Sequence, residues 1–316
     1  MTTPLVKAVG LKKYFKVPAG TVHAVDDISF EIPKGETLGL VGESGCGKST
    51  TGRLLVRLVD ATAGKFFFEG RDILPLKNKE LQGIRRDMQF IFQDPYSSLD
   101  PRKSIGDSIG TPLQILGKLG KKERESRVDA LMDQVGLDPR LYNKYPHELD
   151  GGSRQRVGIA RALALSPRFI VCDEPVSALD VSIQAQIINL LMELQRRLHL
   201  TFLFVSHDLS VVKYISDRIA VMYLGKIVES AETASLFSKP AHPYTQALLG
   251  AVPEPELGAR NKERIILQGG VPSPLNPPSG CRFHTRCRYK TERCSAEEPL
   301  LEEIFPNHIA ACWNCR

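Results

Sequence analysis

The sequence lacks long apolar runs. Its 316 residues contain no stretch of about 18 consecutive apolar residues, so no transmembrane helix is predicted. The first residues, MTTPLVKAVGLKKYFKV, also lack the apolar core of a signal peptide. We therefore expect the chain to remain in the cytosol.

Concentrated basic segments are also missing. The formal net charge is +6, but lysine and arginine are dispersed along the chain and are not gathered into one stripe with aromatic residues. This distribution argues against a nucleic acid partner. Phosphate ligands and an anionic membrane surface are both compatible with the positive charge.

Cysteine is scarce over most of the chain. Only Cys46 and Cys172 occur in the first 280 residues, whereas five cysteines lie between Cys281 and Cys315. This asymmetry predicts a separate small module at the C-terminal end. In a cytosolic protein such a cluster favours metal binding over disulfides.

What the sequence does contain is a series of short apolar runs typical of buried strands. They are ETLGLVG, RFIVCDEP, TFLFVSHD and IAVMYLG, and a helix is expected from Lys48. The segment VSIQAQIINLLMELQRRLHL has helical periodicity between two of these runs. The alternation predicts an α/β fold with a mixed or parallel sheet and crossover helices, an architecture that binds nucleotides.

Two segments depart from this alternation. From about Asp94 to Tyr145 the sequence is charged, has helical periodicity and is punctuated by prolines, which predicts an inserted helical subdomain. The segment LQGGVPSPLNPPSG is rich in proline, glycine and serine, so it is expected to connect the α/β region to the cysteine cluster.

The segment GESGCGKS, residues 42–49, predicts a phosphate-binding loop, because this glycine pattern follows a strand and precedes a helix. Its glycines let backbone N–H groups converge on phosphates at the helix N-terminus. Lys48 would reach the β- and γ-phosphates, and the Ser49 hydroxyl would bind Mg²⁺. The expected nucleotide contacts are Gly42, Ser44, Gly45, Cys46, Gly47, Lys48, Ser49 and Thr50. Cys46 could have a lowered pKa, although a small residue that simply fits is the favoured interpretation.

A second motif places two carboxylates at the end of an apolar strand. In RFIVCDEP, Asp173 is expected to hold Mg²⁺ and Glu174 to orient or polarise the attacking water. Together with the phosphate-binding loop, this pattern predicts hydrolysis of a nucleoside triphosphate.

Over about residues 5–235, these motifs resemble the ATP-binding subunits of ABC transporters. FIFQDP resembles the Q-loop, which implies that Gln93 contacts Mg²⁺ or water and acts as the hinge to the helical subdomain. SALD resembles the D-loop, and VSHD resembles the switch region, which implies that His207 contacts the γ-phosphate. Tyr14 resembles the aromatic residue that stacks on adenine, with Phe15 or a structural tyrosine as the alternatives.

The signature of the family is altered in this chain. ABC proteins usually carry L-S-G-G-Q at a helix N-terminus, facing the ATP bound by the opposite subunit, and here the segment reads LDGGS, with Asp150, Gly151, Gly152 and Ser153. Asp150 is a good helix N-cap. An ionised carboxylate cannot donate a hydrogen bond, and like charges about 4 Å apart repel by about 4 kcal/mol at an effective dielectric of about 20. We therefore hypothesise that this signature weakens the ATP site it completes, which would call for a heterodimer.

The C-terminal segments HPYTQALLGAVP and PSPLNPPSGCRFHTRC resemble the extension of the ATP-binding subunits of oligopeptide and dipeptide importers. The resemblance implies a [4Fe–4S] cluster at Cys281, Cys287, Cys294 and Cys312. Four thiolates suit zinc as well, free or oxidised thiols are a further alternative, and Cys315 is a spare or rival ligand. His284 and His308 are possible ligands, but solvated loop histidines are the favoured interpretation.

The resemblance implies a fold and an assembly. Residues 1–235 are predicted to form an ABC-type nucleotide-binding domain, with a helical subdomain at about 94–155, and residues 236–316 a cysteine-rich extension. The chain would be an ATPase on the cytoplasmic face of the membrane, with a second ATP-binding subunit, two permease subunits and an external solute-binding protein as partners. The alternatives are an importer of nickel or another small solute, and a soluble ABC ATPase acting outside transport.

Overall fold

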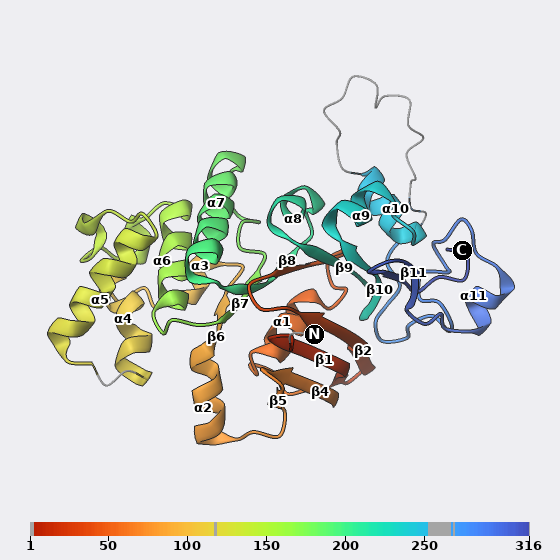
Figure 1. The fold of residues 1–316 in the computed structure, drawn as a ribbon, viewed down its shortest axis with the longest axis horizontal. Coiled ribbons are helices and arrows are strands. Elements are labelled where there is room, and N and C mark those ends of the chain that lie inside the picture. Colours follow the sequence, from red (N-terminus) through yellow and green to blue (C-terminus); the bar gives the residue numbers. More distant parts are fainter. Residues whose placement is uncertain (1–2, 117–118, 252–266, 268, 316) are drawn as a thin grey trace. The chain divides into compact units, whose positions relative to one another are not determined.

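The computed structural model of this chain describes residues 3–116, 119–251, 267 and 269–315, which form two compact units. The first unit contains the residues up to Ile32, Thr37–Leu74 and the residues from Ser206 onward, and the second contains Pro33–Glu36 and Pro75–Val205. Both units combine helices with strands (Figure 1), which confirms the predicted mixed α/β content. Among the described helices, none is both long enough and apolar enough to cross a membrane.

One sheet of the first unit is antiparallel, with the strand order β2-β1-β4-β5. Alternate residues of its strand β1, such as Val6 and Ala8, are buried, which is the period-two pattern of a sheet with one covered face. The strands are β1 (Val6–Val17), β2 (Gly20–Ile32), β4 (Ala63–Phe68) and β5 (Arg71–Asp72).

The other strands of the first unit run in the order β11-β12-β10-β9-β3, with β3 and β9 parallel and the remaining pairs antiparallel. All five residues of β3 are buried, as predicted for the apolar run that precedes the glycine-rich loop. These strands are β3 (Thr37–Val41), β9 (Arg218–Tyr223), β10 (Lys226–Glu232), β11 (Glu302–Phe305) and β12 (His308–Ala310). The helices of this unit are α1 (Lys48–Leu55), α8 (Leu209–Ile215), α9 (Thr233–Ser238), α10 (Pro243–Gly250) and α11 (Glu292–Ala296).

The second unit contains a parallel set of strands in the order β8-β7-β6. Every residue of β7 and β8 is buried, which explains why both appear in the sequence as continuous apolar runs. The strands are β6 (Met88–Ile91), β7 (Phe169–Asp173) and β8 (Thr201–Ser206), and the predicted helix between the last two is confirmed as α7 (Val181–Leu198).

Helices make up the remainder of the second unit. In Figure 1 the helices α4 and α5, in yellow, lie beside α6, and each pair among these three is in contact. The predicted helical segment KKERESRVDALMDQVGL is confirmed as α5. The helices are α2 (Asn78–Asp87), α3 (Pro95–Ser98), α4 (Ile105–Leu116), α5 (Lys121–Gln134) and α6 (Gly151–Leu163), with short 3₁₀ turns at Pro139–Leu141 and Pro146–Glu148.

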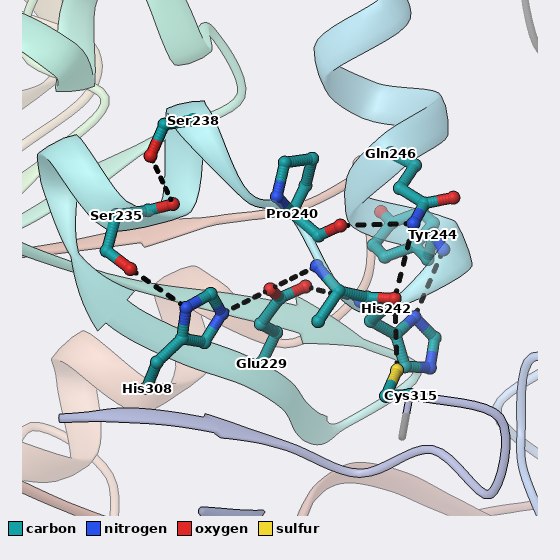
Figure 2. A network of polar contacts seen from close by, with 10 residues as sticks. Glu229, Ser235, Ser238, Pro240, His242, Tyr244, Gln246, His308 and Cys315 are labelled. Atoms are coloured by element: carbon teal, nitrogen blue, oxygen red, sulfur yellow. Dashed lines mark hydrogen bonds and ion pairs between the residues drawn. The ribbon is translucent and has the colours of Figure 1, made fainter. Parts of the chain in front are cut away.

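Within the first unit, a buried polar network joins strand β12 to β10 and α9 (Figure 2). The Glu229 carboxylate on β10 accepts hydrogen bonds from the backbone N–H groups of Ala241 and His242, at 2.8 and 2.9 Å. The same carboxylate lies 2.7 Å from Nε2 of His308, whose Nδ1 lies 3.0 Å from the Ser235 hydroxyl. Glu229 and His308 are both fully buried, so this network joins segments about 80 residues apart inside the core.

Candidate nucleotide-binding site

The glycine-rich loop connects β3 to the N-terminus of α1, as predicted. Gly42 and Gly47 both have a positive φ, at 154° and 107°. A Cβ atom on Gly42 would lie 2.1 Å from the carbonyl oxygen of Met222, and one on Gly47 would lie 2.0 Å from that of Ala24. Only glycine fits at these two positions, because neighbouring backbone approaches the loop directly.

Lys48 is the first residue of α1, and its side chain is buried in the loop. Its ammonium group donates hydrogen bonds to the carbonyl oxygens of Gly42 and Glu43, at 2.7 and 3.0 Å. Cys46 is also buried, and desolvation raises the pKa of its thiol above the ordinary value, so the alternative of a lowered pKa is not supported. Of the other predicted contacts, Ser44 and Gly45 are exposed, whereas Ser49 and Thr50 are half-buried.

Glu43, inside the loop, is bound by two side chains of the C-terminal region. The Arg286 guanidinium donates two hydrogen bonds to the Glu43 carboxylate, at 2.7 and 3.2 Å. The Tyr244 hydroxyl accepts a hydrogen bond of 2.8 Å from the backbone N–H of Glu43. Neither contact was predicted. The sequence offered one signal for the Arg286 contact: Glu43 is an acidic residue within a phosphate-binding loop, and such a charge requires a cationic partner.

Tyr14, the predicted adenine-stacking residue, takes part in a second contact with the C-terminal region. Its ring lies 4.4 Å from the His23 ring, centroid to centroid, and its hydroxyl donates to the Asp26 carboxylate. That carboxylate also binds Arg282. Burial, and the hydrogen bond to Asp26, raise the pKa of Tyr14 to about 12. Stacking of Tyr14 on adenine stays a prediction.

His207 also belongs to the first unit. It follows the last residue of β8, is exposed, and precedes the N-cap of α8. The Asp208 side chain accepts a hydrogen bond from the backbone N–H of Ser210, which fixes the start of that helix. The predicted contact of His207 with a γ-phosphate stays a prediction.

In the second unit, the two predicted acidic residues lie at the end of β7. Asp173 is the last residue of the strand and is buried. Glu174 has a positive φ of 46°, which is unusual for a residue with a side chain and marks a constrained turn. Gln93, which follows β6 closely, donates a hydrogen bond of 2.9 Å from Nε2 to the Glu174 carboxylate. The structure therefore brings two of the predicted catalytic residues into direct contact.

The altered signature lies at the start of α6, also in the second unit. Asp150 is the N-cap of this helix, as predicted, and accepts hydrogen bonds of 2.8 Å from both the backbone N–H and the hydroxyl of Ser153. The hydrogen bond from the Ser153 backbone is the main cause of the lowered pKa of Asp150. The carboxylate is therefore ionised at neutral pH. A Cβ atom on Gly152 would lie 2.8 Å from Ile183, so the backbone is closely packed here.

The cysteine cluster does not support the predicted iron–sulfur site. All seven cysteines are free thiols, and among the described residues no group of three or more His, Cys, Asp or Glu is arranged to hold a metal ion. The Cys315 thiol donates to the carbonyl oxygen of Ala241 at 3.0 Å (Figure 2). The prediction of a [4Fe–4S] cluster, or of zinc, is therefore not supported.

The interpretation of His308 as a solvated loop histidine is wrong, because His308 lies on β12, fully buried against Glu229. His284 is half-buried, and its Nδ1 lies 2.8 Å from the carbonyl oxygen of Cys281. Neither histidine lies in a sequence motif, so the sequence did not indicate that His308 contacts Glu229 or that His284 contacts the Cys281 carbonyl.

Two family descriptions match this chain: "ABC transporter" over residues 25–177 and "oligopeptide/dipeptide transporter, C-terminal region" over residues 228–294. The chain is 53% identical over 310 residues to a putative peptide import ATP-binding protein of Brucella ovis, with 98% of each chain covered. It is 51% identical to the oligopeptide transport ATP-binding protein AppF of Bacillus subtilis, over 96% of this chain and 94% of the relative.

Solved structures with the same fold are also similar in sequence. A dimeric ATP-binding cassette in a post-hydrolysis state, bound to ADP and phosphate, is 31% identical with a TM-score of 0.67, covering 72% of this chain and 98% of that chain. CbiO1 of Clostridium perfringens, part of an ABC transporter complex, is 27% identical with a TM-score of 0.67, covering 75% of this chain and 92% of that chain.

Proposed function

This chain belongs to the ATP-binding proteins of the ABC transporter family, and we propose that it powers the import of peptides through a membrane transporter. The chain is an ATPase. Peptide is proposed as the solute because two relatives, named for peptide import and oligopeptide transport, share about half of their residues with this chain over nearly its whole length.

Hydrolysis of ATP assigns a role to each predicted site residue. The loop of residues 42–49 binds the phosphates through its backbone N–H groups, and Lys48 neutralises their charge. Glu174 orients or polarises the attacking water, and Gln93 holds the Glu174 carboxylate in place through the hydrogen bond of 2.9 Å. His207 senses the γ-phosphate. These assignments are inferred from the motifs together with the local geometry of each unit.

The residues proposed to hold Mg²⁺ have suitable donor chemistry. Mg²⁺ prefers oxygen ligands, and Asp173 offers a carboxylate, Ser49 a hydroxyl and Gln93 an amide oxygen. Asp173 is the last residue of β7 and is buried, so its carboxylate lies at the end of the strand where the motif predicts the ion. The ion would supply charge stabilisation to the phosphate oxygens.

The chain is proposed to work as one half of a heterodimer. The ionised Asp150 lies where the family signature carries a serine, so the ATP site that this signature completes would be destabilised by repulsion between the carboxylate and the phosphate. A partner ATP-binding subunit with an ordinary signature would complete the site formed by the phosphate-binding loop of this chain. One strong site and one weak site would result.

The remaining partners follow from peptide import. The helical subdomain, at about residues 94–155, would contact two permease subunits on the cytoplasmic face of the membrane, with Gln93 at its hinge. An external binding protein would deliver the peptide. The residues from 236 onward would form the C-terminal extension.

The test of this proposal is ATP turnover by the reconstituted complex. Turnover should increase when the binding protein is loaded with peptide, and should not increase when it is loaded with nickel. Stimulation by the nickel-loaded binding protein alone would instead indicate an importer of nickel or another small solute. Failure of the chain to copurify with any permease subunit would favour an ATPase that acts outside transport.

A further inference from the structure

We propose that Arg286 and Tyr244, both in the C-terminal region, are positioning residues of the phosphate-binding loop and set the affinity of the chain for ATP. The proposal rests on ATP binding by this chain and is independent of the transported solute.

The first contact is an ion pair within the first unit. The Arg286 guanidinium donates to both carboxylate oxygens of Glu43, and its side chain is only 7% exposed. A planar guanidinium that binds a carboxylate through two hydrogen bonds fixes the orientation of both groups. Arg286 therefore neutralises the one acidic side chain in a loop whose ligand is itself a polyanion.

The second contact holds the backbone of the same residue. The Tyr244 hydroxyl accepts the backbone N–H of Glu43. Its ring is fully buried and packs against the rings of Tyr223 and Phe283, with centroid distances of 4.7 and 5.4 Å. Because the ring cannot move freely, the hydroxyl is a fixed point for the loop.

Both contacts reach Lys48 through one residue, Glu43. The carbonyl oxygen of Glu43 accepts a hydrogen bond of 3.0 Å from the ammonium group of Lys48. Fixing the side chain and the N–H of Glu43 therefore also limits where Lys48 is held before it binds phosphate. A loop that is already ordered loses less conformational entropy on binding its ligand, which increases affinity.

A further chain of hydrogen bonds joins the C-terminal region to the other side of the loop. Arg282 binds Asp26, whose backbone N–H donates to the carbonyl oxygen of Gly225 at 2.8 Å. The N–H of Gly225 donates in turn to the carbonyl oxygen of Cys46, also at 2.8 Å. The loop is thus held at Glu43 by Arg286 and at Cys46 by the hydrogen-bond chain from Arg282. These two arginines lie four residues apart in the sequence.

The experiment measures the Kd of a non-hydrolysable ATP analogue for the full chain, together with its melting temperature. Arg286→Ala should raise the Kd by about tenfold and Tyr244→Phe by about threefold, since a charged and a neutral hydrogen bond are lost. Arg286→Lys should give an intermediate value, because it keeps the charge but loses the paired geometry. The matched control is Arg293→Ala, which removes an exposed arginine paired with Glu297 in the same region and should leave the Kd unchanged.

A double-mutant cycle distinguishes positioning from general structural support. In a Glu43→Ala background, removal of Arg286 should change the Kd by less than about twofold, because Arg286 acts through Glu43. Equal effects in both backgrounds would overturn the proposal, as would a Kd within twofold of wild type for both Arg286→Ala and Tyr244→Phe. If Arg286→Ala does not fold, Tyr244→Phe and Arg286→Lys carry the test. Tight binding by the wild-type chain is the separate test of ATP binding itself.

Discussion

Asp150 and Ser153 form a closed pair at the N-terminus of α6, in which one carboxylate accepts both the backbone N–H and the hydroxyl of the same serine at 2.8 Å. The two residues that depart from the usual signature are therefore partners of each other. The pair stabilises the helix start and leaves a negative charge where the family presents a hydroxyl donor.

Replacing this carboxylate should accelerate the transporter. We predict that Asp150→Ser raises steady-state ATP turnover of the complete complex several-fold, because serine still caps the helix and removes the repulsion from phosphate. The control is Asp138→Ser, which removes a carboxylate that caps a short 3₁₀ turn elsewhere in the same unit. Unchanged turnover in Asp150→Ser would mean that Asp150 is only a helix cap.

The Glu229 network should be essential for stability. Glu229→Ala would leave the N–H groups of Ala241 and His242, together with the His308 ring, buried without their acceptor. We expect a loss of about 3 kcal/mol in the free energy of unfolding. The measurement is the urea denaturation midpoint of Glu229→Ala. The control is Glu232→Ala, which replaces an exposed glutamate on the same strand. Equal midpoints for the two variants would contradict the assigned role of the network.

His242 should make the chain sensitive to acid. Burial lowers the pKa of His242 from 6.5 to about 3, so the unfolded chain binds a proton below pH 6.5 that the folded chain does not bind until about pH 3. The contribution to stability is therefore complete above pH 6.5 and is lost as the pH falls, by at most about 1.4 kcal/mol per pH unit.

The matching variant is His242→Asn, which keeps an acceptor for the backbone N–H of Tyr244. Its free energy of unfolding should fall less steeply than that of the wild type between pH 6.5 and 4.5. His199→Asn, at the exposed C-cap of α7, should keep the wild-type slope. Identical slopes for His242→Asn and the wild type would show that another group dominates the acid response.

The sequence predicted those parts of the fold and site that depend on local patterns. Continuous apolar runs identified β3, β7 and β8, because buried parallel strands carry apolar residues on both faces. The glycine positions of the phosphate-binding loop could also be predicted, since only glycine fits beside the backbone at Gly42 and Gly47.

What could not be predicted are contacts between residues far apart in the chain. Arg286 and Glu43 are separated by 243 positions, and His308 and Glu229 by 79. In both pairs, nothing in the sequence around one residue indicates which distant residue it contacts. The cysteine spacing alone likewise cannot establish whether the four thiols are arranged to hold a metal ion, and the described residues contain no such group.

The measurement that tests the account most directly is ATP-driven accumulation of a labelled peptide in vesicles that contain the complete complex. Wild type should accumulate peptide, and Glu174→Gln should bind ATP but reduce both turnover and accumulation by at least about 10²-fold, since the group that orients water is lost. Glu193→Gln, an exposed glutamate on α7, is the control and should behave as wild type. Peptide accumulation that persists in Glu174→Gln, or that is absent from the wild type, would contradict the assignment of this chain as the ATPase of a peptide importer.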